Sequence, residues 1–257
     1  MAFALITGSS KGIGRAIAHQ LAQKGKPILL IARNEGELKE AASEIREQFK
    51  VEVQWLAADL SDSHAPKKIF DWSASAGYEV DVLVNNAGYG LSGPFERFGL
   101  DVQLNMMRVN MEAVVSLTAL FLPVLKKHPK SYILNIASSA GYQATPYLGL
   151  YAATKSFVRL FSRALHHELK SANVTVTCVN PGATDTAFND RAQVGQKARD
   201  LARKVNMTAD DVAKTAVAAM YSGKTEVITG FINKMGAFLV WLLPKKLVEG
   251  SAAKIYQ

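Results

Sequence analysis

The sequence predicts a doubly wound α/β fold, in which a parallel sheet of about seven strands carries helices on both faces. Apolar runs of strand length recur along the chain, and stretches with helical periodicity lie between them. The apolar runs are continuous rather than alternating, which is typical of strands buried on both faces of a parallel sheet. The composition, with 49% hydrophobic and 20% charged residues, is that of a compact chain able to bury a large core.

The order of the elements follows from these runs. The expected strands are residues 3–7, 27–31, 51–57, 80–84, 132–136, 174–179 and 226–229. Right-handed crossovers then favour two mononucleotide-binding halves in one sheet, with ligands at the carboxyl ends of the strands. No linker or repeat interrupts the chain, so a single domain over 1–257 is expected. A partly helical, mobile lid is expected near 184–207, followed by an apolar C-terminal tail near 232–257.

Cysteine, histidine and charge exclude several classes of protein. The one cysteine, Cys178, cannot form an internal disulfide, which excludes a secreted cross-linked scaffold. The five histidines show no ligand spacing with Cys178 or with one another, so no catalytic metal is expected. The first apolar run stops at Gly8, too early for a signal-peptide core, and a cytoplasmic location is expected. The net charge of +8 fits an anionic partner, but without a long basic block nucleic-acid binding is not expected.

The C-terminal tail departs from the alternating pattern. Residues 236–243 are strongly apolar, are flanked by Lys234, Lys245 and Lys246, and end at Pro244. The run is too short to cross a bilayer, which takes about 20 apolar residues. We expect the tail to pack on its own domain or on a second subunit. Contact with a membrane surface, or a part in a lipid-accepting pocket, is the alternative that we do not favour.

A glycine-rich turn follows the first strand and leads directly into a helix. Gly8, Gly12 and Gly14 stand there with the spacing Gly-x3-Gly-x-Gly. Glycines in such a turn let the backbone approach a pyrophosphate, and the amides and dipole at the helix N-terminus stabilise its charge. The turn therefore predicts a dinucleotide site.

The end of the second strand predicts which dinucleotide is bound. An acidic residue at this place would bind the ribose 2′-hydroxyl of NAD, whereas a basic one accommodates the 2′-phosphate of NADP. Arg33 stands there, and Lys11 in the glycine turn adds a second cation. NADP(H) is therefore the expected cofactor. In the alternative interpretation, Arg33 is a solvated residue paired with Glu37 at i+4.

Three side chains predict the reacting end of the site. Tyr151 and Lys155 are four residues apart on an expected helix over about 149–170, which places them on one helix face. The cation is expected to lower the pKa of the phenol and to make Tyr151 a general acid for a carbonyl being reduced. Ser138 follows the fifth strand, where its hydroxyl can hold a carbonyl oxygen. A capping role for Ser138, with Ser139 in its place, is the alternative.

Taken together, these motifs resemble the short-chain dehydrogenase/reductase (SDR) family, of the NADP-preferring type, whose fold is Rossmann-like. The resemblance covers residues 3 to about 188. Besides the glycine turn, Ser138, Tyr151 and Lys155, it rests in chain order on Asp59-Leu60, Asn85-Asn86-Ala87-Gly88, Asn110 and Pro181-Gly182.

The resemblance implies roles for individual residues. The catalytic set would be Asn110, Ser138, Tyr151 and Lys155, with Asn110 positioning a water in a proton relay to Lys155. The cofactor contacts would be Gly8, Ser10, Lys11, Gly12, Ile13, Gly14, Arg33, Asp59, Leu60, Asn86, Ala87, Gly88, Tyr151, Lys155, Pro181, Gly182, Thr184 and Thr186. A homodimer or homotetramer is expected.

The expected activity is hydride transfer between the nicotinamide of NADP(H) and a carbonyl or secondary alcohol, in the direction of reduction. Phe95, Tyr142, Tyr147 and Phe188, with the apolar tail, point to a hydrophobic ketone or aldehyde such as a 3-oxoacyl compound. The alternative is an NADP-sensing binding module without turnover. Asp185 has no role in this chemistry and is expected to cap the lid helix.

Overall fold

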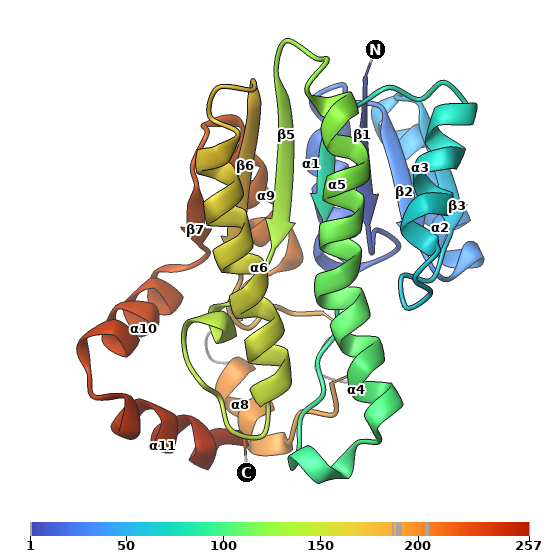
Figure 1. Cartoon of the computed structure of the whole chain (residues 1–257). Coiled ribbons are helices and arrows are strands. Elements are labelled where there is room, and N and C mark those ends of the chain that lie inside the picture. The colour runs from blue at the N-terminus through green and yellow to red at the C-terminus, as the bar shows by residue number, and fades with distance from the viewer. Residues whose placement is uncertain (1, 187, 189–191, 204–205, 257) are drawn as a thin grey trace.

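The computed structural model describes residues 2–186, 188, 192–203 and 206–256. Its centre is a parallel seven-stranded sheet with the strand order β3-β2-β1-β4-β5-β6-β7 (Figure 1). The strands are β1 Phe3–Thr7, β2 Ile28–Ala32, β3 Val53–Ala57, β4 Val80–Asn85, β5 Ser131–Ile136, β6 Val174–Asn180 and β7 Glu226–Ile228. All expected strands are confirmed, with ends that differ by at most two residues. The doubly wound fold class is therefore confirmed.

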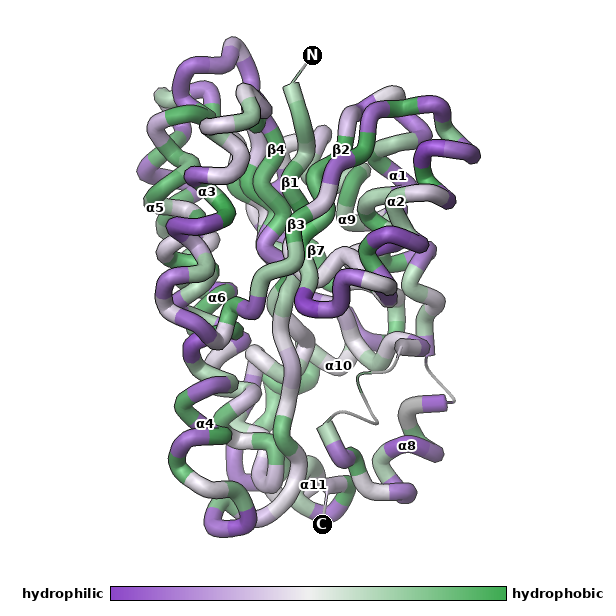
Figure 2. The backbone as a smooth tube through the Cα atoms, turned by 90° about the vertical axis from the view of Figure 1, so that its right-hand side faces the viewer, coloured by the Kyte–Doolittle hydropathy of each residue, from purple (hydrophilic) through white to green (hydrophobic). Residues whose placement is uncertain are grey.

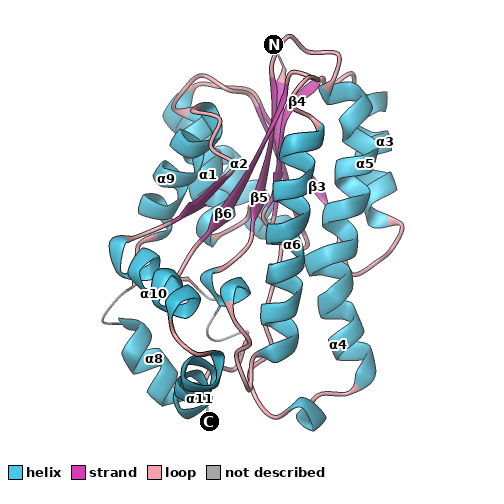
Figure 3. Cartoon of the chain, turned by 60° about the vertical axis from the view of Figure 1, so that its left-hand side comes forward, coloured by secondary structure: helices cyan, strands magenta, loops and turns pink. Residues whose placement is uncertain are grey.

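Two layers of helices cover the sheet (Figure 3). One layer consists of α1 Gly12–Ala22, α2 Glu35–Phe49 and α9 Ala209–Tyr221, and the other of α3 Ala65–Ser75, α5 Ala113–Leu125 and α6 Gly149–Glu168. The remaining described elements are η1 Phe95–Arg97, α4 Leu100–Met107, η2 Arg108–Glu112, η3 Ser139–Tyr142, α8 Gln196–Arg203, α10 Phe231–Leu242 and α11 Lys245–Tyr256.

The first strand shows why the apolar runs are continuous. Ala4 and Ile6 pack in the core under α1, α2 and α9, whereas Phe3 and Leu5 pack in the core under α3 and α5. Because successive side chains of a strand point to opposite faces, burial of both faces requires an apolar residue at every position. In Figure 2 the hydrophobic strands accordingly lie between the two helix layers.

One helical stretch within the described part of the chain, residues 100–125, is long and apolar enough to cross a membrane. Its α5 part packs against the sheet through Leu117, Phe121 and Leu125, which are at most 1% exposed. The α5 part of the stretch is therefore a core element of this fold. Its middle is η2, a π-helical turn, and such turns are frequent at functional sites.

The expected lid is helical in part. Its helix is α8, and Thr184 and Met207 are joined by a β-bridge at its base. The hydroxyl of Thr186 accepts a hydrogen bond from the amide of Phe188. The expected capping role of Asp185 stays a prediction. Positions 187, 189–191 and 204–205 of the lid lie outside the described residues, and lid motion stays a prediction.

The two helices of the C-terminal tail differ in their packing. α11 packs on the lid region through Ala252, Ile255 and Tyr256. α10 has no buried residue. The expectation that the tail packs on its own domain is therefore met by α11, whereas α10 touches the domain through Asn233 and leaves its large apolar side chains exposed. Packing of α10 on a second subunit, the other half of that expectation, stays a prediction.

Candidate active site

A cavity of about 900 Å³ lies at the carboxyl edge of the sheet. Its walls include residues within two positions of a strand end: Gly8 after β1, Arg33 after β2, Asn86 after β4, Ser138 after β5 and Pro181 after β6. The strand order reverses between β1 and β4, which is the place where open α/β sheets bind ligands. Every expected cofactor contact except Gly14 lines this cavity.

The glycine turn is built by backbone conformation and close packing. Gly8 and Gly12 have positive φ angles of 64° and 59°, which favour glycine. Gly14 lies on α1 behind the turn and is not a wall residue of the cavity. A Cβ atom at Gly14 would lie 2.3 Å from the Gly8 carbonyl oxygen. The Asn86 amide donates hydrogen bonds to the carbonyls of Thr7 (2.9 Å) and Gly8 (3.1 Å). Asn86 therefore holds the turn in shape from the neighbouring strand.

The cations expected to select NADP are present at the cavity, each with an acidic partner. Lys11 Nζ lies 3.2 Å from Glu37 Oε1, and Arg33 lies 3.7 Å from Asp59. Glu37 also accepts a 2.9 Å hydrogen bond from the Ser10 hydroxyl, which lowers the pKa of its carboxyl group. The close contacts of Glu37 are thus Ser10 and Lys11, whereas Arg33 acts on the Glu37 carboxyl group only at longer range and has its own ion pair with Asp59.

Glu37 is a wall residue that the sequence did not assign to the site. It lies in the first turn of α2, where its amide is capped by the Asn34 side chain. The signal for it was the Asn34-x-x-Glu37 spacing, which resembles a capping box. In the fold the Glu37 carboxylate turns to the glycine turn instead, because α1 and α2 begin side by side at this edge.

The reacting end of the cavity brings together Ser138, Tyr151 and Lys155. Tyr151 and Lys155 lie on α6 and are only 7% and 5% exposed. The Lys155 ammonium donates a 2.9 Å hydrogen bond to the carbonyl of Ile136 and lies 5.9 Å from the centre of the Tyr151 ring. Ser138, rather than Ser139, interacts with Tyr151, and its hydroxyl also accepts a hydrogen bond from the Ala140 amide.

Burial controls the protonation of the pair on α6. It raises the pKa of Tyr151 to about 12, although the hydrogen bond with Ser138 acts in the opposite direction. The expected lowering of the Tyr151 pKa is therefore wrong, because the cost of desolvating a phenolate outweighs the hydrogen bond with Ser138. Burial lowers the pKa of Lys155 to about 8. At neutral pH the phenol holds its proton and can donate it.

Asn110 lies next to the reacting end of the cavity but is not one of its wall residues. Its side-chain oxygen accepts a hydrogen bond from the Tyr89 amide, and its NH₂ group donates to the Tyr89 carbonyl and to the Thr154 hydroxyl. A Cβ atom on Gly88 would lie 3.1 Å from both Asn110 Oδ1 and Lys155 Nζ. Asn110 thus lies close to Lys155, and its expected part in a proton relay stays a prediction.

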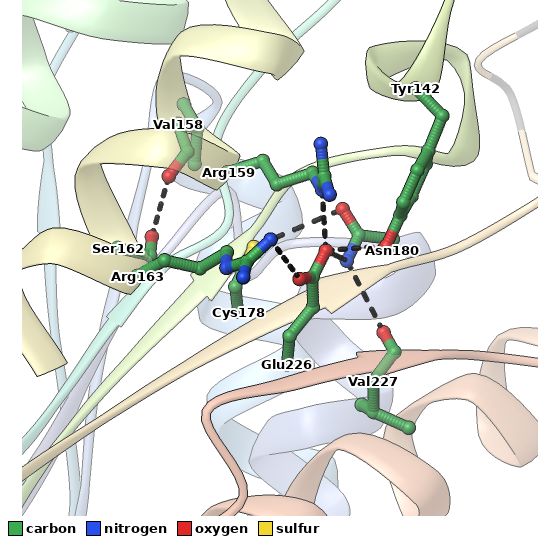
Figure 4. Close-up of polar contacts among 9 residues, drawn as sticks. All are labelled: Tyr142, Val158, Arg159, Ser162, Arg163, Cys178, Asn180, Glu226 and Val227. Atoms are coloured by element: carbon green, nitrogen blue, oxygen red, sulfur yellow. Dashed lines mark hydrogen bonds and ion pairs between the residues drawn. The ribbon is translucent and has the colours of Figure 1, made fainter. Parts of the chain in front are cut away.

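A partly buried ionic network lies next to this end of the cavity (Figure 4). Glu226, 18% exposed in its side chain, accepts hydrogen bonds from Tyr142, from Arg159 at 2.6 Å and from Asn180 at 3.1 Å. Arg163 lies 3.4 Å from its second oxygen. Burial, followed by the contact with Glu226, raises the pKa of the Tyr142 phenol.

The network joins the segments that carry the reacting groups. Tyr142 ends the short helix that begins next to Ser138, and Arg159 is one turn beyond Lys155 on α6. Asn180 directly precedes Pro181 in the cavity wall. Glu226 therefore connects three walls of the site. No sequence pattern predicts this role, because Glu226 is far along the chain from its partners.

The walls beside Tyr151 are apolar. They are formed by Leu148, Phe188, Val194, Ala198 and Tyr256. The Phe188 and Tyr151 rings are 5.2 Å apart. Of the aromatic residues expected around the substrate, Phe188 lines the cavity, but Phe95, Tyr142 and Tyr147 are not among its walls. Tyr256, which belongs to the apolar tail also expected there, is a wall residue because α11 returns the end of the chain to the site.

These features fit a phosphorylated dinucleotide. The turn at Gly8 and Gly12 leaves an open backbone at the N-terminus of α1, a helix without acidic residues in its first turn. Lys11 and Arg33 at one end are suited to a phosphate, and Lys155 lies at the other end. The cavity connects both ends in a single space.

Comparison with known proteins places this geometry in a family. Residues 2–197 match the family described as short chain dehydrogenase. The very-long-chain 3-oxoacyl-CoA reductases of Homo sapiens and Anas platyrhynchos are 38% and 41% identical to the chain over 185 and 187 residues. These matches cover 70% of this chain and 58% and 59% of the relatives, so the chain spans less than two thirds of their length.

A solved structure extends the likeness beyond sequence. The short-chain dehydrogenase from Sphingobium yanoikuyae in complex with NADPH superposes with a TM-score of 0.80 at 28% identity. The match covers 89% of this chain and 87% of the other. With the family match over residues 2–197, these findings show that the chain belongs to the short chain dehydrogenase family.

Proposed function

We propose that this protein is an NADP-dependent oxidoreductase that reduces a hydrophobic carbonyl compound, such as a 3-oxoacyl thioester. The observation that carries the proposal is the convergence of Ser138, Tyr151 and Lys155 at the apolar end of one cavity. The printed activity of the relatives, very-long-chain 3-oxoacyl-CoA reductase, supports the substrate class. The NADPH complex of the Sphingobium yanoikuyae enzyme supports the cofactor.

Residues at the two ends of the cavity would hold the cofactor. The backbone around Gly12 and the N-terminus of α1 would bind the pyrophosphate. Lys11 and Arg33 would bind the phosphate of the adenosine ribose, and Lys155 would bind the second ribose. When bound, the cofactor supplies the hydride for reduction of the carbonyl carbon.

The side chains of the reacting end would handle the proton. The Ser138 hydroxyl donates a hydrogen bond to the substrate carbonyl oxygen and holds it beside Tyr151. The Tyr151 phenol, protonated at neutral pH, gives its proton to that oxygen as negative charge develops there. The Lys155 ammonium, buried nearby, stabilises the phenolate that remains. The walls around Phe188 exclude water from this exchange.

A spectrophotometric assay of NADPH oxidation tests the proposal. Saturated 3-oxoacyl-CoA thioesters of increasing chain length are compared with small polar sugars at equal concentration. We expect kcat/KM to rise with acyl length and the sugars to react slowly, because the cavity walls near Tyr151 are apolar. A clear preference for the sugars would disprove the hydrophobic substrate, and no turnover with any carbonyl would disprove the reductase.

The alternative, an NADP-sensing module without turnover, is less well supported. A sensor needs a dinucleotide site but no buried proton donor, whereas Tyr151 and Lys155 carry a large desolvation cost. A Tyr151→Phe protein that kept full biological activity would favour the sensor.

The proposal also includes a homo-oligomeric state and a cytoplasmic location. A homodimer or homotetramer is supported by apolar side chains exposed on α5 and α6, among them Val115, Phe157 and Leu160. A cytoplasmic location is supported by the free, buried thiol of Cys178. Light scattering of the purified protein and fractionation of cells test these two points.

A further inference from the structure

The apolar face of α10 points away from the protein. Every large apolar residue among Phe231, Ile232, Met235, Phe238, Leu239, Trp241 and Leu242 is exposed, with Trp241 at 79% and Phe231 at 76%. The side turned to the protein carries Asn233, whose amide donates a hydrogen bond to the Thr229 carbonyl beside Gly182. An amphipathic surface helix normally buries its apolar stripe, so the orientation of α10 is reversed.

The exposed face continues past the helix. Leu243 and Leu247 are 42% and 63% exposed, and α10 leaves the β7 edge of the sheet before the chain turns back as α11 beside α8 (Figure 1). A contiguous apolar surface of this kind on a soluble chain marks an interaction site. We call this surface, formed by the exposed apolar residues between Phe231 and Leu247, the α10 face.

Basic residues flank the α10 face along the chain. The segment from Phe231 to Tyr256 contains four lysines, at positions 234, 245, 246 and 254, and one acidic residue, Glu249. All four lysines are exposed. A Trp, Phe and Leu surface bordered by lysines matches a bilayer interface with anionic headgroups, in which the apolar side chains enter the acyl boundary and the cations remain among the phosphates.

The charge distribution favours lipid over a second copy of the chain. A two-fold interface over this face would bring the lysines of both copies to the border of one buried patch, with Glu249 as the only acidic residue of the segment to offset them. An anionic bilayer instead neutralises them. The cavity also opens near α11, because Tyr256 of that helix is one of its walls.

We propose that the α10 face docks the protein on an anionic lipid surface. The apolar side chains of α10 supply most of the binding energy, and Lys234, Lys245 and Lys246 select anionic over neutral headgroups. Docking does not depend on the proposed reductase activity, so the two can fail separately. For a substrate with a long acyl chain, docking would bring the apolar end of the cavity next to the bilayer.

Sedimentation of the full chain with vesicles tests the proposal. The vesicles contain phosphatidylcholine with or without 30% phosphatidylglycerol, a composition chosen as roughly that of a strongly anionic surface. We expect binding to the anionic vesicles only. Phe238→Ser with Trp241→Ser should weaken it at least about tenfold, because two exposed apolar anchors are lost. Lys245→Glu with Lys246→Glu should also weaken it at least about tenfold, and more strongly at low salt.

Matched variants elsewhere on the surface serve as controls. Lys126→Glu with Lys127→Glu makes the same charge change at another exposed lysine pair. Phe95→Ser with Leu100→Ser removes two apolar side chains that are 73% and 70% exposed. Both should bind vesicles like the parent chain. Equal loss in the controls, or no binding of the parent chain to anionic vesicles, would overturn the proposal. Light scattering that shows a dimer broken by the α10 variants alone would assign the face to a second copy instead.

Discussion

The two ends of the cavity contain ionisable groups in opposite environments. At the adenosine end, Lys11, Arg33 and Asp59 are between 46% and 64% exposed in their side chains. At the reacting end, Tyr151 and Lys155 are at most 7% exposed. Water and salt screen exposed charges and weaken their ion pairs. Such residues therefore select a ligand only where they contact it directly. Buried groups change their pKa values, so their surroundings determine their chemistry.

The strongest test of this difference is Tyr151→Phe. The variant keeps the shape of the ring but loses the proton donor, and we expect kcat to fall by about 10²- to 10⁴-fold. The affinity for NADPH should stay within about threefold of the parent value, because the adenosine end is unchanged. Steady-state kinetics and calorimetry measure the two quantities. A kcat within about threefold of the parent chain would show that another group donates the proton.

Lys155→Met tests burial of the cation through the pH dependence of stability. Burial lowers the Lys155 pKa from 10.5 to about 8, so between these pH values the unfolded chain holds one more proton than the folded chain. Burying the charged ammonium lowers the free energy of unfolding at neutral pH. As the pH rises through that range this cost disappears, so the free energy of unfolding of the parent chain increases.

The methionine variant has no ionisable group at this position and therefore lacks this increase in the free energy of unfolding. Relative to the parent chain, its free energy of unfolding should be higher at pH 7 than at pH 10 by about 2 to 3 kcal/mol. Tyr151 acts in the other direction, but only above about pH 10, where the unfolded phenol loses its proton first. Urea unfolding at both pH values gives the comparison, with the exposed Lys127→Met as control. A difference independent of pH would contradict a buried cation.

At the exposed end, Arg33→Asp should change the choice of cofactor. We expect NADPH affinity to fall about 10- to 100-fold, since a charge-assisted contact to phosphate is lost, whereas NADH affinity is kept or improved. Lys39→Asp makes the same charge change on the exposed side of α2 and should alter neither affinity. Calorimetry separates the outcomes, and an equal loss for both dinucleotides would mean that Arg33 does not contact the 2′-phosphate.

Glu226→Gln examines the network behind the reacting end. Glutamine keeps the acceptor oxygen for Tyr142 but removes the charge between Arg159 and Arg163, and we expect a loss of about 2 kcal/mol in the free energy of unfolding. The exposed pair of Glu35 gives the control, since Glu35→Gln should cost less than about 0.5 kcal/mol. Thermal unfolding measures both. Equal losses would show that burial of Glu226 does not strengthen its contacts.

The smallest expected effect belongs to Glu37→Gln. Removing a carboxylate from the neighbourhood of Lys11 should raise NADPH affinity by about two- to fivefold at low salt and less at high salt. Calorimetry at two salt concentrations tests this. A fall in affinity would indicate that Glu37 is needed to hold Lys11 in position.

Local patterns predicted the frame of the site. The glycine turn from Gly8 to Gly14 and the spacing of Tyr151 and Lys155 are each contained in one short segment, and the fold places both as expected. The apolar runs predicted every strand of the sheet because burial on both faces leaves a clear composition signal. Residues of this kind can be identified without knowledge of tertiary contacts.

What escaped prediction depends on segments that meet only in the fold. Glu37 reaches Ser10 across 27 positions, and Glu226 reaches Arg159 across 67. Tyr256 joins the cavity because α11 folds back over the lid. The pKa of Tyr151 was expected to fall because its burial could not be read from a neighbouring lysine. Long-range contacts and desolvation therefore account for the errors.

A combined binding and turnover experiment tests whether the adenosine end selects the cofactor and the reacting end donates the proton. NADPH and NADH are titrated calorimetrically into the parent chain, Arg33→Asp and Tyr151→Phe, and the same samples are assayed for turnover with a 3-oxoacyl-CoA. The account predicts that Arg33→Asp loses its preference for NADPH but still turns over with NADH, whereas Tyr151→Phe binds NADPH normally and does not turn over. Loss of NADPH binding in Tyr151→Phe, or an unchanged preference in Arg33→Asp, would contradict it.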